Sequence, residues 1–118
     1  MALTPQSELR DVHGISDDKK VAIKTFMQGA VYCWVKNRKG EQFAVRDLMG
    51  GENFEWEGTP LYALYEKHIG KGKSVEDAVA AAAIDLGWLV KATLVADKRN
   101  FEAVKDFVNI YRWVGNEP

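Results

Sequence analysis

Hydrophobic residues recur at helical spacing between residues 17 and 37, which predicts one long amphipathic helix. Three lysines and a glutamine form the opposing polar stripe. A competing interpretation ends the helix at Gly29 and makes the following "AVYCWVKN" a strand, because valine, tyrosine and tryptophan favour β-sheets. The expected inner face of the long helix consists of Ile23, Phe26, Met27, Ala30, Cys33 and Trp34.

The segments on either side of this helix have weaker patterns. Pro5, directly after Thr4, is a helix-start signal, and Gly14 would end the short helix that follows. Residues 42–51, "QFAVRDLMGG", are rich in β-prone residues and end in two glycines. They predict one brief strand followed by a loop.

Helix signals are stronger in the second half of the chain. Pro60 begins a helix that ends at the "GKGK" run, and Ser74 caps the next one. "DLG" at 85–87 predicts a break before a third helix at 88–97. The alternative is one continuous helix over 75–97, because an interior glycine costs only about 1 kcal/mol relative to alanine.

The C-terminal stretch "KRNFEAVKDFVNIYRWVG" fits two structures. Its apolar positions recur at helical spacing, but nearly every residue from Phe107 to Val114 is β-branched or aromatic, which favours strands. The two local signals nearly balance, and the preceding pair of predicted helices tips the choice to a β-hairpin. The predicted fold class is α+β and mainly α, a helical domain with a C-terminal hairpin, and the alternative is an all-α bundle.

Composition and charge limit the classes of protein. A chain of 118 residues with 47% hydrophobic residues is expected to form one domain, with a long helix and short strand in 1–58 and a second half in 59–115. Cys33 is the single cysteine, so an intramolecular disulfide is excluded and a reducing cytoplasmic location is expected. The polar N-terminus has no signal core, and no stretch approaches the roughly 20 apolar residues that span a bilayer.

Residues with catalytic chemistry are isolated along the sequence. His13 and His68 have no partner at metal-binding spacing, and both are expected at the surface. Cys33 is expected to be a small core residue, and Glu55 and Glu57 lack the spacing of an acid/base pair. The sequence therefore predicts a protein that is not an enzyme and holds no cofactor or metal.

Residues 59–115 resemble the winged helix-turn-helix pattern, in which a capped small-residue helix and a tight turn precede a second helix and a β-prone wing. That resemblance implies binding to double-stranded DNA, with the second helix in the major groove and the wing on the phosphates. The implied nucleic-acid-binding residues are Trp88, Lys91, Thr93, Lys98, Arg99 and Lys105. Phrases such as "AVYCWVKN" and "GTPLYALYEKH" also look like those of uncharacterised bacterial proteins from phages and mobile gene cassettes, which implies no activity.

A net charge of −1 gives the chain no general attraction to nucleic acid, so a second hypothesis is needed. Exposed aromatic clusters commonly mark partner sites, and the sequence has two aromatic clusters. These predict a protein-interaction domain or a homodimer. The expected interaction residues are Phe54, Trp56, Tyr111 and Trp113.

Overall fold

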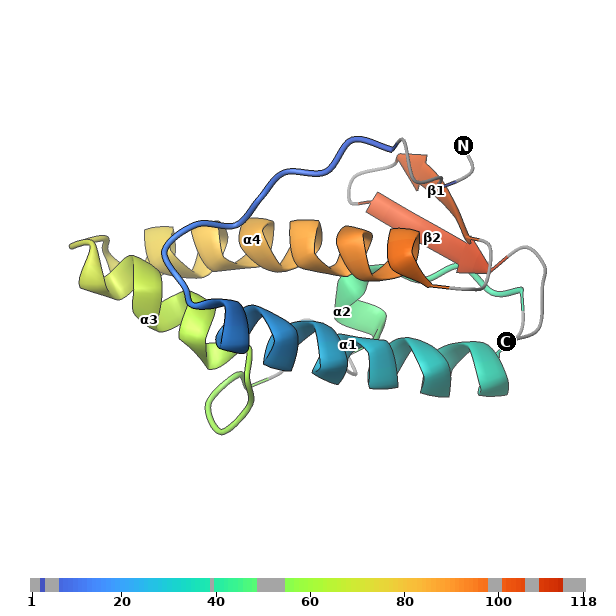
Figure 1. Ribbon diagram of the computed structural model, residues 1–118, viewed down its shortest axis with the longest axis horizontal. Helices are drawn as coiled ribbons and strands as arrows, with labels where there is room; N and C mark the ends of the chain where they lie inside the picture. Colours follow the sequence, from blue (N-terminus) through green and yellow to red (C-terminus); the bar gives the residue numbers. More distant parts are fainter. Residues whose placement is uncertain are drawn as a thin grey trace.

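The computed structural model describes residues 3, 7–38, 40–48, 55–97, 101–105 and 109–113, with the backbone alone at 104, 105 and 109. The described chain is mainly helical and ends in a two-stranded antiparallel sheet, so the α+β, mainly α prediction is confirmed. Figure 1 shows the elements in order: α1 (Asp17–Asn37), α2 (Val45–Leu48), α3 (Tyr62–Gly70), α4 (Val75–Ala96), β1 (Phe101–Lys105) and β2 (Asn109–Trp113).

The long helix α1 has the predicted bounds, and the strand interpretation after Gly29 is wrong. The Ser16 side chain accepts a hydrogen bond from the Lys19 backbone N–H at 3.2 Å, which satisfies one of the free donors of the first turn. The expected inner face is partly wrong, because Phe26 and Cys33 are exposed. The buried residues of α1 are Ile23, Met27, Val31 and Val35, each four positions after the last.

Helix α4 runs without interruption through Gly87, so the predicted break at 85–87 is wrong and the continuous alternative is correct. Leu86, Leu89 and Val90 on both sides of the glycine are buried, and this packing outweighs the helix-weakening effect of Gly87. The tight turn expected between two helices is therefore absent from residues 75–96.

Helix α4 is apolar enough to pass a test for membrane-spanning helices, and it also supplies much of the buried core. Among the described residues, α4 is the one helix long and apolar enough to cross a membrane by length and composition, contrary to the sequence expectation. Leu86, Val90 and Leu94 on this helix belong to the buried core, and α4 contacts both α1 and α3. A core helix meets the same length and composition test.

The C-terminal hairpin confirms the strand interpretation of the last predicted element. β1 pairs with β2 from Phe101 opposite Trp113 to Lys105 opposite Asn109. Figure 1 shows this hairpin over the C-terminal end of α4. Its backbone ladder supplies hydrogen bonds that a helix would have made locally.

Within the described residues 42–48, the strand predicted at 42–51 is reduced to one bridging residue. Phe43 and Tyr111 exchange two backbone hydrogen bonds of 2.7 Å, so Phe43 extends the hairpin by a single bridge. The next residues form the short helix α2 instead, because the Asp47 carboxylate accepts a hydrogen bond from the Ala44 backbone N–H at 2.8 Å.

The N-terminal segment is not helical over residues 7–16, so the short helix expected before Gly14 is absent from this described part. The segment runs along the helices to the start of α1 (Figure 1). Val12 is buried in the core, and Lys20 reaches back from α1 to Asp11. Residues 7–16 therefore cover the helices as an extended strap.

Candidate functional site

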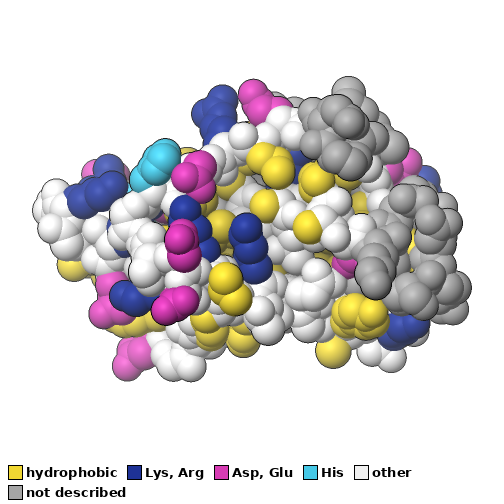
Figure 2. Space-filling view, in the orientation of Figure 1, with side chains coloured by type: hydrophobic (Ala, Val, Ile, Leu, Met, Phe, Trp, Pro, Cys, Tyr) yellow, Lys and Arg dark blue, Asp and Glu magenta, His cyan; other side chains and the backbone are white. Residues whose placement is uncertain are grey.

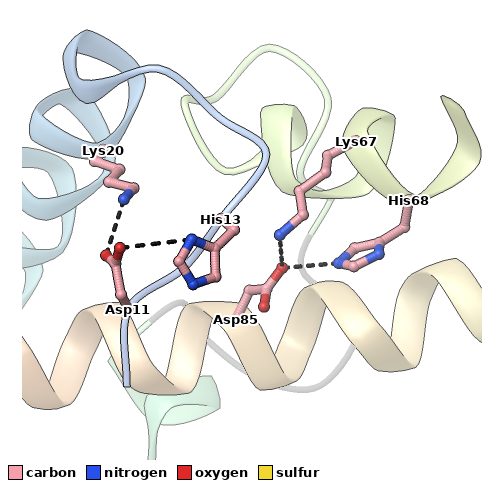
Figure 3. A network of polar contacts seen from close by, with 6 residues as sticks. All are labelled: Asp11, His13, Lys20, Lys67, His68 and Asp85. Carbon is pink, nitrogen blue, oxygen red and sulfur yellow. Dashed lines mark hydrogen bonds and ion pairs between the residues drawn. The ribbon is translucent and has the colours of Figure 1, made fainter. Parts of the chain in front are cut away.

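A buried polar network joins α3 to α4. Lys67 Nζ lies 2.8 Å and His68 Nε2 lies 2.7 Å from the same Asp85 carboxylate oxygen (Figure 3). The side chains of Lys67 and His68 are 6% and 9% exposed. Two groups that can be positive thus converge on one carboxylate inside the protein.

The extended strap, residues 7–16, packs against this network at Gly14, which lies beside the Lys67 side chain. Gly14 has a φ of +86°, in the left-handed region, and a Cβ there would lie 3.0 Å from Cε of Lys67. Glycine is the residue that meets both requirements, because it has no side chain and tolerates positive φ. The close passage of Gly14 helps to keep the Lys67 side chain out of water.

A second ion pair, between the exposed Asp11 of the strap and Lys20 of α1, lies nearby. Lys20 Nζ lies 2.9 Å from the Asp11 carboxylate, and His13 Nδ1 lies 3.6 Å from it (Figure 3). The hydrogen bond from Lys20, followed by its charge, lowers the pKa of Asp11. This pair therefore stabilises the fold above the ordinary pKa of an aspartate, and the contribution is lost as pH falls through the lowered value.

The contacts of the buried network are those of an ion pair that links α3 to α4. Asp85 orients the His68 ring through Nε2, and within the described part of the chain the buried Nδ1 atom has no hydrogen-bond partner whose proton it could accept. Within the described ranges, no group of three or more His, Cys, Asp or Glu side chains could hold a metal ion. The expectation of a surface histidine at 68 is wrong, because His68 is 7% exposed. Its position four residues after the buried Leu64 was the signal for an inner face.

The residues implied by the winged-helix resemblance are only partly available. Trp88 is half-buried, with Arg10 and Lys91 at 5.1 and 5.3 Å from its ring centre. The expectation of an exposed Thr93 is wrong, because it is 5% exposed and donates a hydrogen bond of 2.9 Å to the Leu89 carbonyl. The positions outside the described residues or side chains are Lys98, Arg99 and Lys105.

The aromatic residues expected to bind a partner belong mostly to the core. Tyr111 is 2% exposed, so its predicted surface position is wrong. Its ring centre lies 6.0 Å from that of Phe43, and the two rings fill the space under the hairpin. Trp56 and Trp113 are half-buried and pack against the same core. Phe54 lies outside the described residues.

The outward face of α1 is the exposed surface that sequence reasoning missed. We define it by Val21, Ala22, Thr25, Phe26, Gly29, Tyr32 and Cys33, all of which are exposed. Val21 is 61% exposed and Tyr32 is 41% exposed. None of these seven residues is charged. The exposed charged residues of α1 are Lys24, within the same span, and Asp17, Asp18, Lys19 and Lys36 toward its ends.

No protein-family model, no curated protein and no solved structure matches this chain. The winged-helix and phage-protein likenesses therefore rest on the sequence patterns alone.

Proposed function

We propose that this protein is a non-enzymatic protein-interaction module that self-associates through the outward face of α1. The observation that carries the proposal is the group of seven exposed, uncharged residues between Val21 and Cys33, on a helix whose other side fills the core. Contact with another apolar surface would remove Val21, Phe26 and Tyr32 from water, at roughly 25 cal/mol for each Å² of apolar area.

Helix α4 offers a competing apolar surface. Val75 and Val79 are more than half exposed near its N-terminal end. The exposed acidic residues Glu76 and Asp77 lie in the same first turn. Two copies of this surface would bring like charges together, so α1 is the better candidate for contact between identical chains.

The expected association is weak to moderate. With 21 residues, α1 is about 32 Å long at 1.5 Å per residue, so one helix pair gives an interface at the small end, below about 1,200 Å². We therefore expect a reversible dimer that sedimentation equilibrium detects in a concentration series reaching about 1 mM, where even −4 kcal/mol of association is half complete.

Thr25→Glu is expected to weaken the dimer at least about tenfold, because it buries an unpaired carboxylate in the contact of each copy. Thr25 is exposed, and glutamate is a better helix former than threonine, so α1 itself should not be weakened. Sedimentation equilibrium gives the dimer dissociation constant, and circular dichroism gives the helix content.

The matched control is Ala80→Glu, which places the same charge on the exposed side of α4. We expect this variant to dimerise as the wild type does. A wild-type protein that stays monomeric throughout the series contradicts self-association. If Ala80→Glu abolishes the dimer and Thr25→Glu does not, the contact surface is on α4 and not on α1.

DNA binding by a winged-helix-like second half is the alternative proposal. One observation favours it: Arg10 and Lys91 surround the half-buried Trp88, which joins positive charge to an aromatic ring. In Figure 2, however, positive and negative side chains alternate toward the end of the molecule that carries α3. A continuous basic surface, the usual source of DNA affinity, is not visible in the described part of this face.

Fluorescence anisotropy with a labelled mixed-sequence duplex tests the DNA proposal. If it is correct, the protein binds in low salt, and Lys91→Ala weakens binding to all sequences about equally and lowers the salt dependence by about one counterion. Affinity weaker than about 100 μM in low salt contradicts it.

We also propose a cytoplasmic location, as part of the self-association proposal. Cys33 is the single cysteine of the chain, and its exposed position places a thiol on the proposed contact surface. A reducing compartment would keep this thiol from forming random intermolecular disulfides.

A further inference from the structure

The residues along the outermost line of α1 follow a palindromic spacing. Their separations are four, three, four, three and four, and such alternation keeps side chains on one side of a helix. We infer that α1 packs antiparallel against α1 of a second copy, about a two-fold axis near residue 27. This inference rests on the proposed self-association and specifies its partner surface. The outermost residues are Asp18, Ala22, Thr25, Gly29, Tyr32 and Lys36.

The antiparallel arrangement brings opposite charges together. In this register, the numbers of facing residues add to 54, so Asp18 of each copy faces Lys36 of the other. Asp17 and Asp18 lie in the first turn of α1 and Lys36 lies in the last. Lys19 and Lys20 follow the two aspartates, so the favourable contact is the particular pair Asp18 and Lys36 and not the net charge of the helix ends. A parallel pair would place Asp18 beside Asp18 and would also align the two helix dipoles, both of which are unfavourable.

Side-chain sizes are complementary in the same register. The small Ala22 faces the large Tyr32 of the second copy, so each tyrosine has space beside an alanine. At the axis, Thr25 faces Gly29, and the two helices can approach most closely there. The two-fold axis generates each of these contacts twice, once from each copy. The surface is therefore complementary to itself, as a closed two-fold dimer requires.

Gly29 is otherwise unexplained by the fold. It lies within regular helix, and a Cβ added there would meet nothing within 4 Å in its own chain. Neither backbone conformation nor internal packing requires glycine, although it costs the helix about 1 kcal/mol relative to alanine. Close approach by the backbone of a second helix at the axis gives a physical reason for its presence.

Cysteine cross-linking tests this register with the native Cys33 as one partner. Residue 22 of one copy and Cys33 of the other lie at nearly the same height, since their numbers add to 55, and on the same side of the helix pair. Ala22→Cys is therefore expected to form an intermolecular disulfide when the dimer is treated with the thiol oxidant diamide. In the wild type, the two Cys33 residues are roughly 18 Å apart along the axis, at 1.5 Å per residue, and should not cross-link.

Non-reducing electrophoresis and peptide mass mapping give the result, with Ala80→Cys on α4 as the control for random collision. A 22–33 disulfide in most of the Ala22→Cys protein, at least about tenfold faster than in the control, supports the register. A dimer in sedimentation without this cross-link, or a fast Cys33–Cys33 disulfide in the wild type, overturns the antiparallel register and leaves self-association standing. A monomer in sedimentation removes both.

Discussion

Replacing Phe43 with alanine is expected to lower the free energy of unfolding by about 3–5 kcal/mol, the range for deleting a buried phenylalanine ring. Phe43 is 1% exposed. Its ring centre lies 5.8 Å from that of Trp34 and 6.2 Å from that of Phe101, so it joins α1 to the hairpin. Alanine would leave a cavity between these elements. Urea denaturation followed by tryptophan fluorescence measures the loss.

Phe26→Ala is the matched control, because it removes the same ring from an exposed position of α1. At protein concentrations low enough to keep the chain monomeric, its cost should stay below about 1 kcal/mol. Equal losses for the two variants would contradict the placement of Phe43 at the centre of the core and of Phe26 outside it.

Local signals in the sequence are enough to locate the starts of the long helices. Ser16 and Ser74 each precede a helix and accept a hydrogen bond from the backbone three residues on, at 3.2 Å in both cases. Such caps need no distant part of the chain, so sequence alone reveals them. The strands of the hairpin were predicted from β-branched and aromatic residues, which nearly balanced the helical periodicity, and from a preceding helix pair that is in fact the single helix α4.

The continuity of α4 and the orientation of α1 depend on tertiary packing. Gly87 is a local break signal, but buried leucines on both sides hold the helix together. In α1, Phe26 and Cys33 fit helical spacing as well as Val31 and Val35 do. The position of α4 against α1 decides which of these two pairs faces inward. A local sequence pattern carries no information about that position.

The candidate sites were the least predictable part of the protein. His68 and Asp85 are 17 residues apart and meet only because α3 packs on α4. Thr93 looked available because threonine is polar, yet its hydroxyl bonds to its own helix and permits burial. The outward face of α1 was not predicted, because two of its residues, Phe26 and Cys33, have the helical spacing of an inner face.

Asp85→Asn is expected to lower the free energy of unfolding by about 3 kcal/mol, because it leaves the buried Lys67 ammonium without a negative partner. The amide oxygen can still accept a hydrogen bond from His68, so the change removes charge and little volume. The Asp85 side chain is 18% exposed and that of Lys67 is 6% exposed, which limits rescue by water. Urea denaturation at pH 7 measures the loss.

The double variant Lys67→Met, Asp85→Asn separates the charge from the rest of the network. Methionine fills a similar volume without a charge, and replacing a buried ion pair by neutral groups is often close to neutral for stability. We therefore expect the double variant to recover to within about 1 kcal/mol of the wild type. If it is as unstable as Asp85→Asn alone, the loss comes from the carboxylate's contact with His68 or from packing, and the unpaired lysine is not its cause. If Asp85→Asn alone costs nothing, Lys67 reaches water and the network is not a buried ion pair.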